Sequence, residues 1–217
     1  AVQEVFIRLY EKGYIYKGLK PVYWCPECQT ALAEAEIEYA EDPCHSIYVK
    51  FTVTDDLGKL SALGAEMGKT YFVIWTTTTW TLPANVAICV GPEYQYGVYK
   101  ANGEYYVLAT ELADRTMKAA NIEEYELLGT LKGSELEYMK CAHPFIDRTS
   151  LVIVGSHVTL ESGTGCVHTA PGHGVDDFEV CQHYKEIPMV VPVDSKGVLT
   201  EEAGEFAGLT TDKANKA

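Results

Sequence analysis

The fold is decided by residues 71–90, which read YFVIWTTTTWTLPANVAICV. The apolar runs at 71–75 and 86–90 are rich in β-branched and aromatic residues, a composition typical of strands. The first run leads into a threonine-rich segment and then into a turn that contains Pro83. We therefore expect two strands joined by a polar turn.

The same strand composition recurs along the rest of the chain. Further runs of this kind lie at 14–24, 37–53, 96–99, 105–109, 125–131, 151–154 and 189–193. Asn102-Gly103 stands between two of these runs, and this dipeptide is a strong signal for a β-hairpin. Strands are therefore expected to dominate the fold.

Helical spacing of apolar residues appears only at 1–12, 110–120 and 176–184. Asp176 or Asp177 stands where the last of these helices begins, and either side chain suits an N-cap. The sequence thus predicts a mainly β (α+β) fold, namely a β-barrel with a few peripheral helices.

Three parts are expected along the chain. Residues 1–45 form a connecting segment with a zinc-knuckle-like Cys-x-x-Cys, 46–200 form the barrel, and 201–217 form a return segment. The regular rhythm of strands begins only after residue 45, which is why the first part is set aside.

Composition limits the classes of function. The 217 residues carry a net charge of −14, which argues against a protein that grips duplex nucleic acid over a wide face. No apolar run approaches the ~20 residues that cross a bilayer, so no membrane partner is expected. Seven cysteines without a signal peptide favour reduced thiols. We expect a cytoplasmic monomer.

The pair Cys25 and Cys28 stands in the run WCPEC. Two thiolates at this spacing can share one tetrahedral zinc ion, but a complete site needs two more ligands. The run therefore fits two interpretations, one half of a zinc site or a turn that binds no metal.

The four threonines at 76–79 are not a pattern of a protein core. They fit an edge strand whose hydroxyls bond to the backbone. They fit equally a pocket mouth, where hydroxyls and free N–H groups meet a polar ligand.

A segment rich in glycine and proline covers residues 162–178 and reads SGTGCVHTAPGHGVDDF. Such backbone can approach a ligand closely. Within this segment, a stretch of ten positions contains four polar residues: His168, His173, Asp176 and Asp177. Asp177 suits a helix N-cap, a ligand-binding carboxylate or a general base, and the spacing matches no common metal motif.

Residues 75–85, WTTTTWTLPAN, together with 163–177, GTGCVHTAPGHGVDD, resemble the editing domain inserted into isoleucyl-tRNA synthetases. Thr79 replaces an expected proline, and Cys166 replaces a more usual alanine. The motifs of the synthetic domain, which uses ATP and Mg²⁺, are absent, so this chain is not expected to charge tRNA. In the full-length enzyme, a structural zinc ion bound by Cys25 and Cys28 together with other ligands is possible.

The resemblance implies hydrolysis of the ester of mischarged valyl-tRNA(Ile) by a positioned water, without a cofactor. It implies that Asp177 holds the α-ammonium, that His168 is a steric wall against isoleucine, and that Thr77 and Thr78 lie near the ester. The remaining substrate contacts that it implies are Trp75, Thr76, Trp80, Thr81, Asn85, His173 and Asp176.

The implied partners are the aminoacylated 3′ end of tRNA(Ile) with its non-cognate aminoacyl group, and the rest of the synthetase. Two other classes of function stay open. One is a metal-dependent hydrolase that uses His168, His173 and Asp177. The other is a module that binds the 3′ end of tRNA without catalysis.

Overall fold

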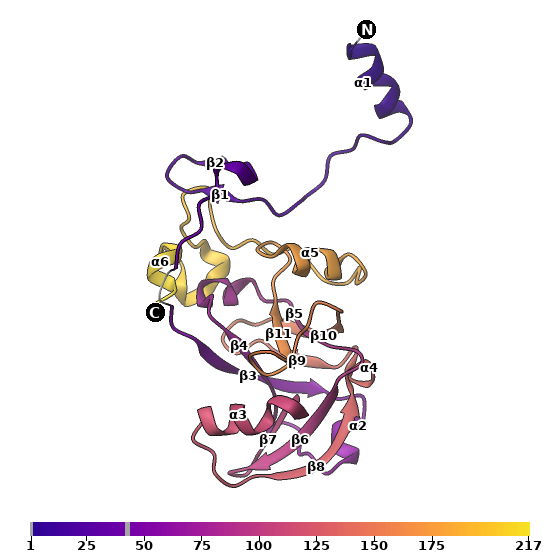
Figure 1. Ribbon diagram of the computed structural model, residues 1–217, viewed down its shortest axis with the longest axis vertical. Coiled ribbons are helices and arrows are strands. Elements are labelled where there is room, and N and C mark those ends of the chain that lie inside the picture. The colour runs from indigo at the N-terminus through magenta and orange to yellow at the C-terminus, as the bar shows by residue number, and fades with distance from the viewer. Residues whose placement is uncertain (1, 42–43) are drawn as a thin grey trace.

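The structure is a computed structural model that describes residues 2–41 and 44–217. Its main sheet contains, among these residues, nine strands: β3 (Ile47–Asp55), β4 (Thr70–Thr76), β5 (Ala87–Val90), β6 (Gln95–Ala101), β7 (Glu104–Ala109), β8 (Glu126–Lys132), β9 (Lys140–Ala142), β10 (Thr149–Val154) and β11 (Cys166–Thr169). The predicted mainly β class is confirmed (Figure 1).

The strand order of this sheet is β11-β5-β10-β9-β3-β4-β7-β6-β8. The pairs β5–β10 and β4–β7 are parallel, and the other pairs are antiparallel. No ladder joins β11 to β8 among the described strands, so the closed barrel that we predicted is not found there. β11 also packs against β4. This contact places the glycine-rich segment, residues 162–178, beside the threonine-rich turn that follows β4, residues 76–81.

Two predicted strands are wrong. The run at 14–24 contains only β1 (Trp24–Cys25), which pairs with β2 (Thr30–Ala31). The run at 189–193 contributes only an isolated bridge. Instead of pairing in a sheet, both runs contribute apolar side chains to the lining of one cavity. In the run at 37–53, the described strand begins at Ile47, and residues 42–43 lie outside the described residues.

The predicted hairpin is confirmed between β6 and β7, where Ala101 pairs with Glu104. Asn102 and Gly103 both have positive φ, at 52° and 79°, as a tight two-residue hairpin turn requires.

The predicted helices are confirmed at all three places, and each described α-helix is shorter than its predicted range. The described helices and 3-10 turns are α1 (Val2–Glu11), η1 (Glu34–Glu36), α2 (Lys59–Ala62), η2 (Thr79–Ala84), η3 (Thr110–Leu112), α3 (Ala113–Ala119), α4 (Gly133–Leu136), α5 (Val175–Cys181), η4 (Glu201–Phe206) and α6 (Thr211–Ala214). None of the described helices is both long and apolar enough to cross a membrane.

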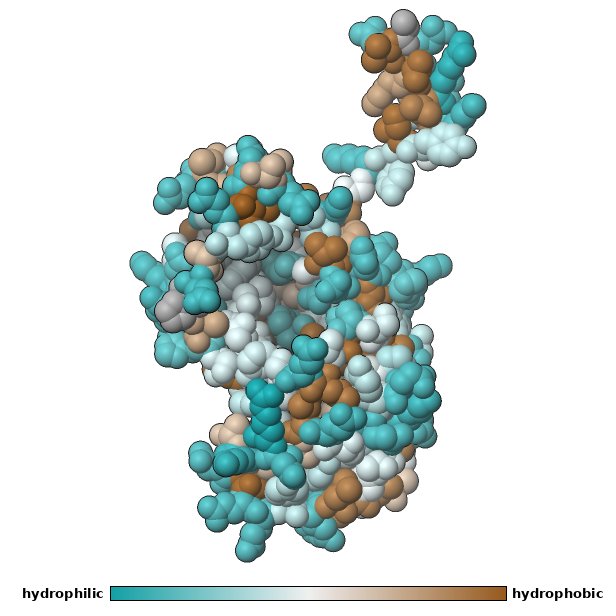
Figure 2. Space-filling model, viewed as in Figure 1, coloured by the Kyte–Doolittle hydropathy of each residue, from teal (hydrophilic) through white to brown (hydrophobic). Residues whose placement is uncertain are grey.

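Helix α1 lies apart from the sheet (Figure 1) and contains no buried residue. Its apolar side chains gather on one face, which Figure 2 shows in brown, and Val2 and Phe6 are 84% and 57% exposed. The segment therefore contributes nothing to the core of the sheet.

The core that positions the site lies against the main sheet and is built from fully buried residues such as Phe51, Phe72, Ile74 and Ile88. A smaller cluster of Leu199, Ala203 and Ala214 forms near the C-terminus, and Trp80 packs against it. Because η4 and α6 also contact η2, the C-terminal segment supports the threonine turn from outside the sheet.

Candidate functional site

The threonine turn, residues 76–81, begins where β4 ends. The N–H of Thr78 donates to Oγ1 of Thr76 at 3.0 Å, and Oγ1 of Thr81 donates to the carbonyl of Thr78 at 2.8 Å. Thr76 and Thr81 are buried, whereas Thr77 is half-buried and Thr78 is exposed. Two hydroxyls therefore hold the turn together, while those of Thr77 and Thr78 make no described hydrogen bond within the chain.

His168 lies on β11, and both of its ring nitrogens are engaged. Nε2 lies 3.0 Å from Oγ1 of Thr81, and Nδ1 lies 2.7 Å from Nδ2 of Asn85. An amide nitrogen can only donate, so Nδ1 accepts. Because Thr81 gives its own proton to Thr78, Nε2 carries a hydrogen and donates to Thr81. The contacts thus select a single neutral tautomer.

The electrostatics of His168 agree with this assignment. Burial lowers its pKa to about 3, with smaller contributions from His143 and His173. The ring is therefore neutral at pH 7. A neutral imidazole whose only acceptor nitrogen is already occupied is held in a fixed orientation and is a poor general base.

Asn85 fixes this ring from behind. It is fully buried, its Nδ2 also donates to the carbonyl of Ala87 at 2.9 Å, and its Oδ1 accepts from Ser150 at 2.5 Å. In the structure the amide of Asn85 contacts His168, Ala87 and Ser150, and its predicted contact with a substrate stays a prediction.

Two further residues, which the sequence did not reveal, hold residues 82–85, which directly follow the threonine turn. His143 donates from Nε2 to the carbonyl of Leu82 at 2.8 Å, and burial lowers its pKa to about 4. Arg148 donates to the carbonyls of Pro83 and Asn85 at 2.7 and 3.1 Å. Both lie more than 60 residues from these partners, so no local spacing could have identified them.

Asp177 is the third residue of α5, and the residue that caps this helix is Gly174. The predicted N-cap role of Asp176 or Asp177 is therefore wrong. The carboxylate of Asp177 turns back, and its Oδ2 accepts the N–H of Ala170 at 2.9 Å. A Cβ on Gly174 would lie 2.9 Å from the same oxygen, so the glycine makes room for it. Asp176 is exposed.

Burial raises the pKa of Asp177, while the N–H of Ala170 and the nearby His157 oppose that rise. In the described part of the chain, Oδ1 of Asp177 makes no hydrogen bond. A cation that approached this oxygen would favour the charged carboxylate.

His173 faces Trp80 edge to face, with ring centroids 5.0 Å apart. Its Nε2 is buried without a hydrogen-bond partner among the described residues, and burial lowers the pKa of the ring to about 4. Nearby, a Cβ on Gly163 would lie 3.4 Å from Trp75, which shows that the glycine-rich segment packs on the end of β4.

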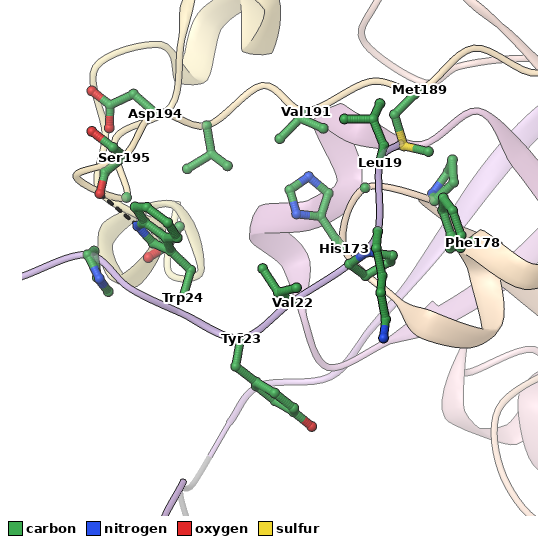
Figure 3. Close-up of a pocket in the computed structure, with 18 of the residues that line it drawn as sticks. Leu19, Val22, Tyr23, Trp24, His173, Phe178, Met189, Val191, Asp194 and Ser195 are labelled. Carbon is green, nitrogen blue, oxygen red and sulfur yellow. Dashed lines mark hydrogen bonds between the residues drawn. The ribbon is translucent and has the colours of Figure 1, made fainter. Parts of the chain in front are cut away.

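A cavity of about 570 Å³ opens beside His173. In Figure 3 the His173 ring lies between the segment that carries Val22 and the segment that carries Val191. Figure 2 shows a hollow between the β1–β2 hairpin and the sheet. Trp80 also lines this cavity, whereas the lining does not include the predicted catalytic residues Thr77, Thr78, His168 and Asp177.

Among the described residues, no three His, Cys, Asp or Glu side chains lie close enough to hold one metal ion. His168, His173 and Asp177 therefore do not form the metal centre of our alternative prediction. Cys25 and Cys28 do lie together, because the N–H of Cys28 donates to Sγ of Cys25 at 3.3 Å.

Comparison with known proteins gives consistent results. The family described as tRNA synthetases class I (I, L, M and V) matches residues 1–139. The chain is 60% identical over 98% of its length to Isoleucine--tRNA ligase of Caldicellulosiruptor saccharolyticus, and 55% identical over 98% to that of Thermoanaerobacter sp.. It spans 23% of the length of each of these relatives.

Two solved structures share the fold. GlLeuRS-CP1 matches with a TM-score of 0.64 and 16% identity, over 79% of this chain and 92% of that one. The editing domain of P. falciparum cytosolic leucyl-tRNA synthetase matches with a TM-score of 0.61 and 10% identity, over 79% and 93%.

Proposed function

This chain belongs to the family of class I tRNA synthetases for I, L, M and V, and we propose that it is the editing domain of an isoleucyl-tRNA synthetase. Its substrate is the aminoacylated 3′ end of valyl-tRNA(Ile), and its reaction is hydrolysis of the aminoacyl ester. The observation that carries this proposal is the immobilised neutral ring of His168 beside the threonine turn. Such a ring excludes by shape and does not take part in proton transfer.

The need for exclusion follows from a general limit on binding. One methylene in an apolar pocket changes the binding free energy by only about 1–3 kcal/mol, and the discrimination of isoleucine from valine by isoleucyl-tRNA synthetases is the usual example of this limit. A second pocket that admits valine and refuses isoleucine solves the problem. We assign the refusal to His168, whose two hydrogen bonds prevent the ring from turning aside.

Asp177 is assigned to the α-ammonium of the aminoacyl group. One of its oxygens is held by Ala170, and the other is free of described partners. Charge-assisted hydrogen bonds from an ammonium to a half-buried carboxylate are among the stronger polar contacts. They would also offset the burial that raises the pKa of Asp177.

The chemistry is attack of a water on the ester carbonyl, with release of the amino acid and the free ribose hydroxyl. The leaving ribose oxygen takes up one proton, and the attacking water gives one up. The exposed or half-buried hydroxyls of Thr78 and Thr77 are assigned to hold this water, together with the neighbouring hydroxyl of the ribose. Orientation of the two reactants accounts for the rate.

The proposal includes a structural zinc only as a property of the larger enzyme. The two thiols lie together, because the N–H of Cys28 donates to Sγ of Cys25, and two thiols supply half of a tetrahedral site. The rest of the synthetase would have to supply the other two ligands. We further propose that the enzyme is a cytoplasmic monomer.

The test is a deacylation assay with the full-length synthetase that contains this chain. Valyl-tRNA(Ile) and isoleucyl-tRNA(Ile) are compared, each with and without EDTA. We expect rapid loss of the valyl ester, survival of the isoleucyl ester and no effect of EDTA. Loss of activity with EDTA would favour a metal hydrolase, and binding of a non-hydrolysable valyl-adenosine analogue without ester cleavage would favour a binding module.

A further inference from the structure

Asn215, next to α6, makes contacts that neither the proposed reaction nor the known relatives explain. Its Oδ1 accepts the N–H of Thr79 at 2.9 Å and the N–H of Trp80 at 3.4 Å. The hydroxyl of Thr79 lies 3.0 Å from both the carbonyl and Oδ1 of Asn215. Four contacts thus join a single residue to the threonine turn across 136 positions of sequence.

These contacts meet a specific need of the turn. The first N–H groups of a helix or 3-10 turn have no partner within it, and the residue before it normally supplies one. In η2 that residue is Thr78, whose side chain makes no capping hydrogen bond. Asn215 supplies the missing acceptor from a distant segment.

The turn that Asn215 holds carries two residues of the candidate site. Trp80 contacts His173 and lines the cavity. Thr81 lies one residue further and bonds to Nε2 of His168. Any rotation of η2 would therefore move the wall of the cavity and the partner of His168 together.

The support is rigid because Asn215 is itself fixed. α6 is capped by Thr210, whose Oγ1 accepts the N–H of Lys213 at 3.4 Å. Ala214 is buried in the small cluster against which Trp80 packs. Apolar packing and hydrogen bonds thus tie the same two segments together.

We propose that Asn215 is a positioning residue for the editing reaction, which holds the threonine turn in the geometry that hydrolysis and the rejection of isoleucine require. This inference rests on the proposed function. It assigns to the C-terminal segment a part in positioning the site.

The test uses variants of the full-length synthetase. Asn215→Ala removes the acceptor, whereas Asn215→Asp retains one. We expect Asn215→Ala to lower kcat for deacylation of valyl-tRNA(Ile) about tenfold, through misplacement of the turn, with little change in KM. Asn215→Asp should recover most of that loss. Lys213→Ala changes an exposed side chain of the same helix and should behave as wild type.

A second pair of variants tests the contact from the other side. Thr79→Ala removes the hydroxyl that contacts Asn215 and keeps the N–H, so it should lower kcat by less than Asn215→Ala does. The double variant should lose no more than Asn215→Ala alone, because the hydroxyl contact is shared by the two residues. Aminoacylation should be unchanged in all of them. Faster amide exchange at Trp80 in Asn215→Ala would show directly that the turn is released.

Several results would overturn the inference. They are a wild-type kcat in Asn215→Ala, an equal loss in Asn215→Asp, or additive losses in the double variant. If Asn215→Ala fails to fold, a wild-type kcat in Thr79→Ala overturns the inference instead. Failure of the proposed function looks different, because the wild-type synthetase itself would then leave valyl-tRNA(Ile) intact.

Discussion

The polar groups of the candidate site fall into two regions, a closed end around His168 and an open end at residues 173–177, which differ in how many hydrogen-bond partners the protein supplies. At the closed end, made of His168 with Thr81, Asn85 and Ser150, each of these side chains has a hydrogen-bond partner inside the protein. At the open end, made of residues 173–177, Nε2 of His173 has no described partner and Asp177 uses only one oxygen.

This difference separates two tasks. A polar group without a partner in a buried place costs free energy unless a ligand completes it. The open end is therefore suited to binding. The closed end gains nothing from a ligand, and its saturated hydrogen bonds keep His168 in a fixed orientation, which suits it to steric selection.

The largest effect is expected from a change at the open end. Asp177→Ala should lower the rate of valyl-tRNA(Ile) deacylation by at least about 100-fold, because the ammonium loses its charge-assisted partner. Asp177→Asn removes the negative charge, so its deacylation rate should fall nearly as much. It keeps the shape of the side chain and an oxygen for the N–H of Ala170, so its melting temperature should not change. Glu179→Ala, an exposed change on the same helix, is the control. A wild-type rate in Asp177→Asn would remove the carboxylate from the mechanism.

A change at the closed end should alter selectivity and leave the rate for valine largely intact. His168→Ala removes the wall, so isoleucyl-tRNA(Ile) should be hydrolysed within about tenfold of the valyl rate. The measurement is deacylation of both substrates under single-turnover conditions. His173→Ala is the matched control, because it removes an imidazole from the open end and should still spare isoleucine. If His168→Ala also spared isoleucine, the difference between the two ends would lose its functional meaning.

A smaller effect is expected from the support behind the wall. Asn85→Ala leaves Nδ1 of His168, the carbonyl of Ala87 and the hydroxyl of Ser150 without their partner, so unfolding free energy should fall by about 2–4 kcal/mol. Asn85→Asp is more informative, because a carboxylate cannot donate to Nδ1. The ring must then carry a proton there, and its pKa should rise, as NMR titration of His168 would show. Ser150→Ala should cost less than Asn85→Ala, and equal costs would contradict the network.

His168, His173 and Asp177 all fall in one glycine-rich run, and the pattern of that run alone led us to predict a site there. It did not predict that Asp177 leaves the cap to Gly174, because an aspartate near a helix start fits both roles. The boundaries after residues 45 and 200 stay a prediction.

The closed end depends on contacts that no spacing rule expresses. Ser150 lies 65 residues from its partner Asn85, and Asn215, which holds the adjacent threonine turn, lies 136 residues from Thr79. Each looks like an ordinary polar residue in its own stretch. Their role appears only when β10 and α6 are brought beside η2. The class of the fold, by contrast, followed from composition, since strand-forming runs such as 71–75 and 86–90 recur along the chain.

The smallest effect on catalysis is expected from pH. His143, His168 and His173 are neutral in the folded protein, with pKa values lowered by burial to about 4, 3 and 4, whereas an unfolded histidine titrates near pH 6.5. Below about pH 6.5 the unfolded state therefore binds more protons, and stability falls as pH decreases toward 4. Above about pH 6.5 this contribution is constant.

Deacylation by the folded enzyme should show no histidine-like step between pH 6 and 8, since none of the three rings titrates there. Denaturation curves at a series of pH values check the first statement, and a pH–rate profile checks the second. An inflection in the rate near pH 6.5 that disappears in His168→Ala would make His168 a proton carrier and would end its assignment as a wall.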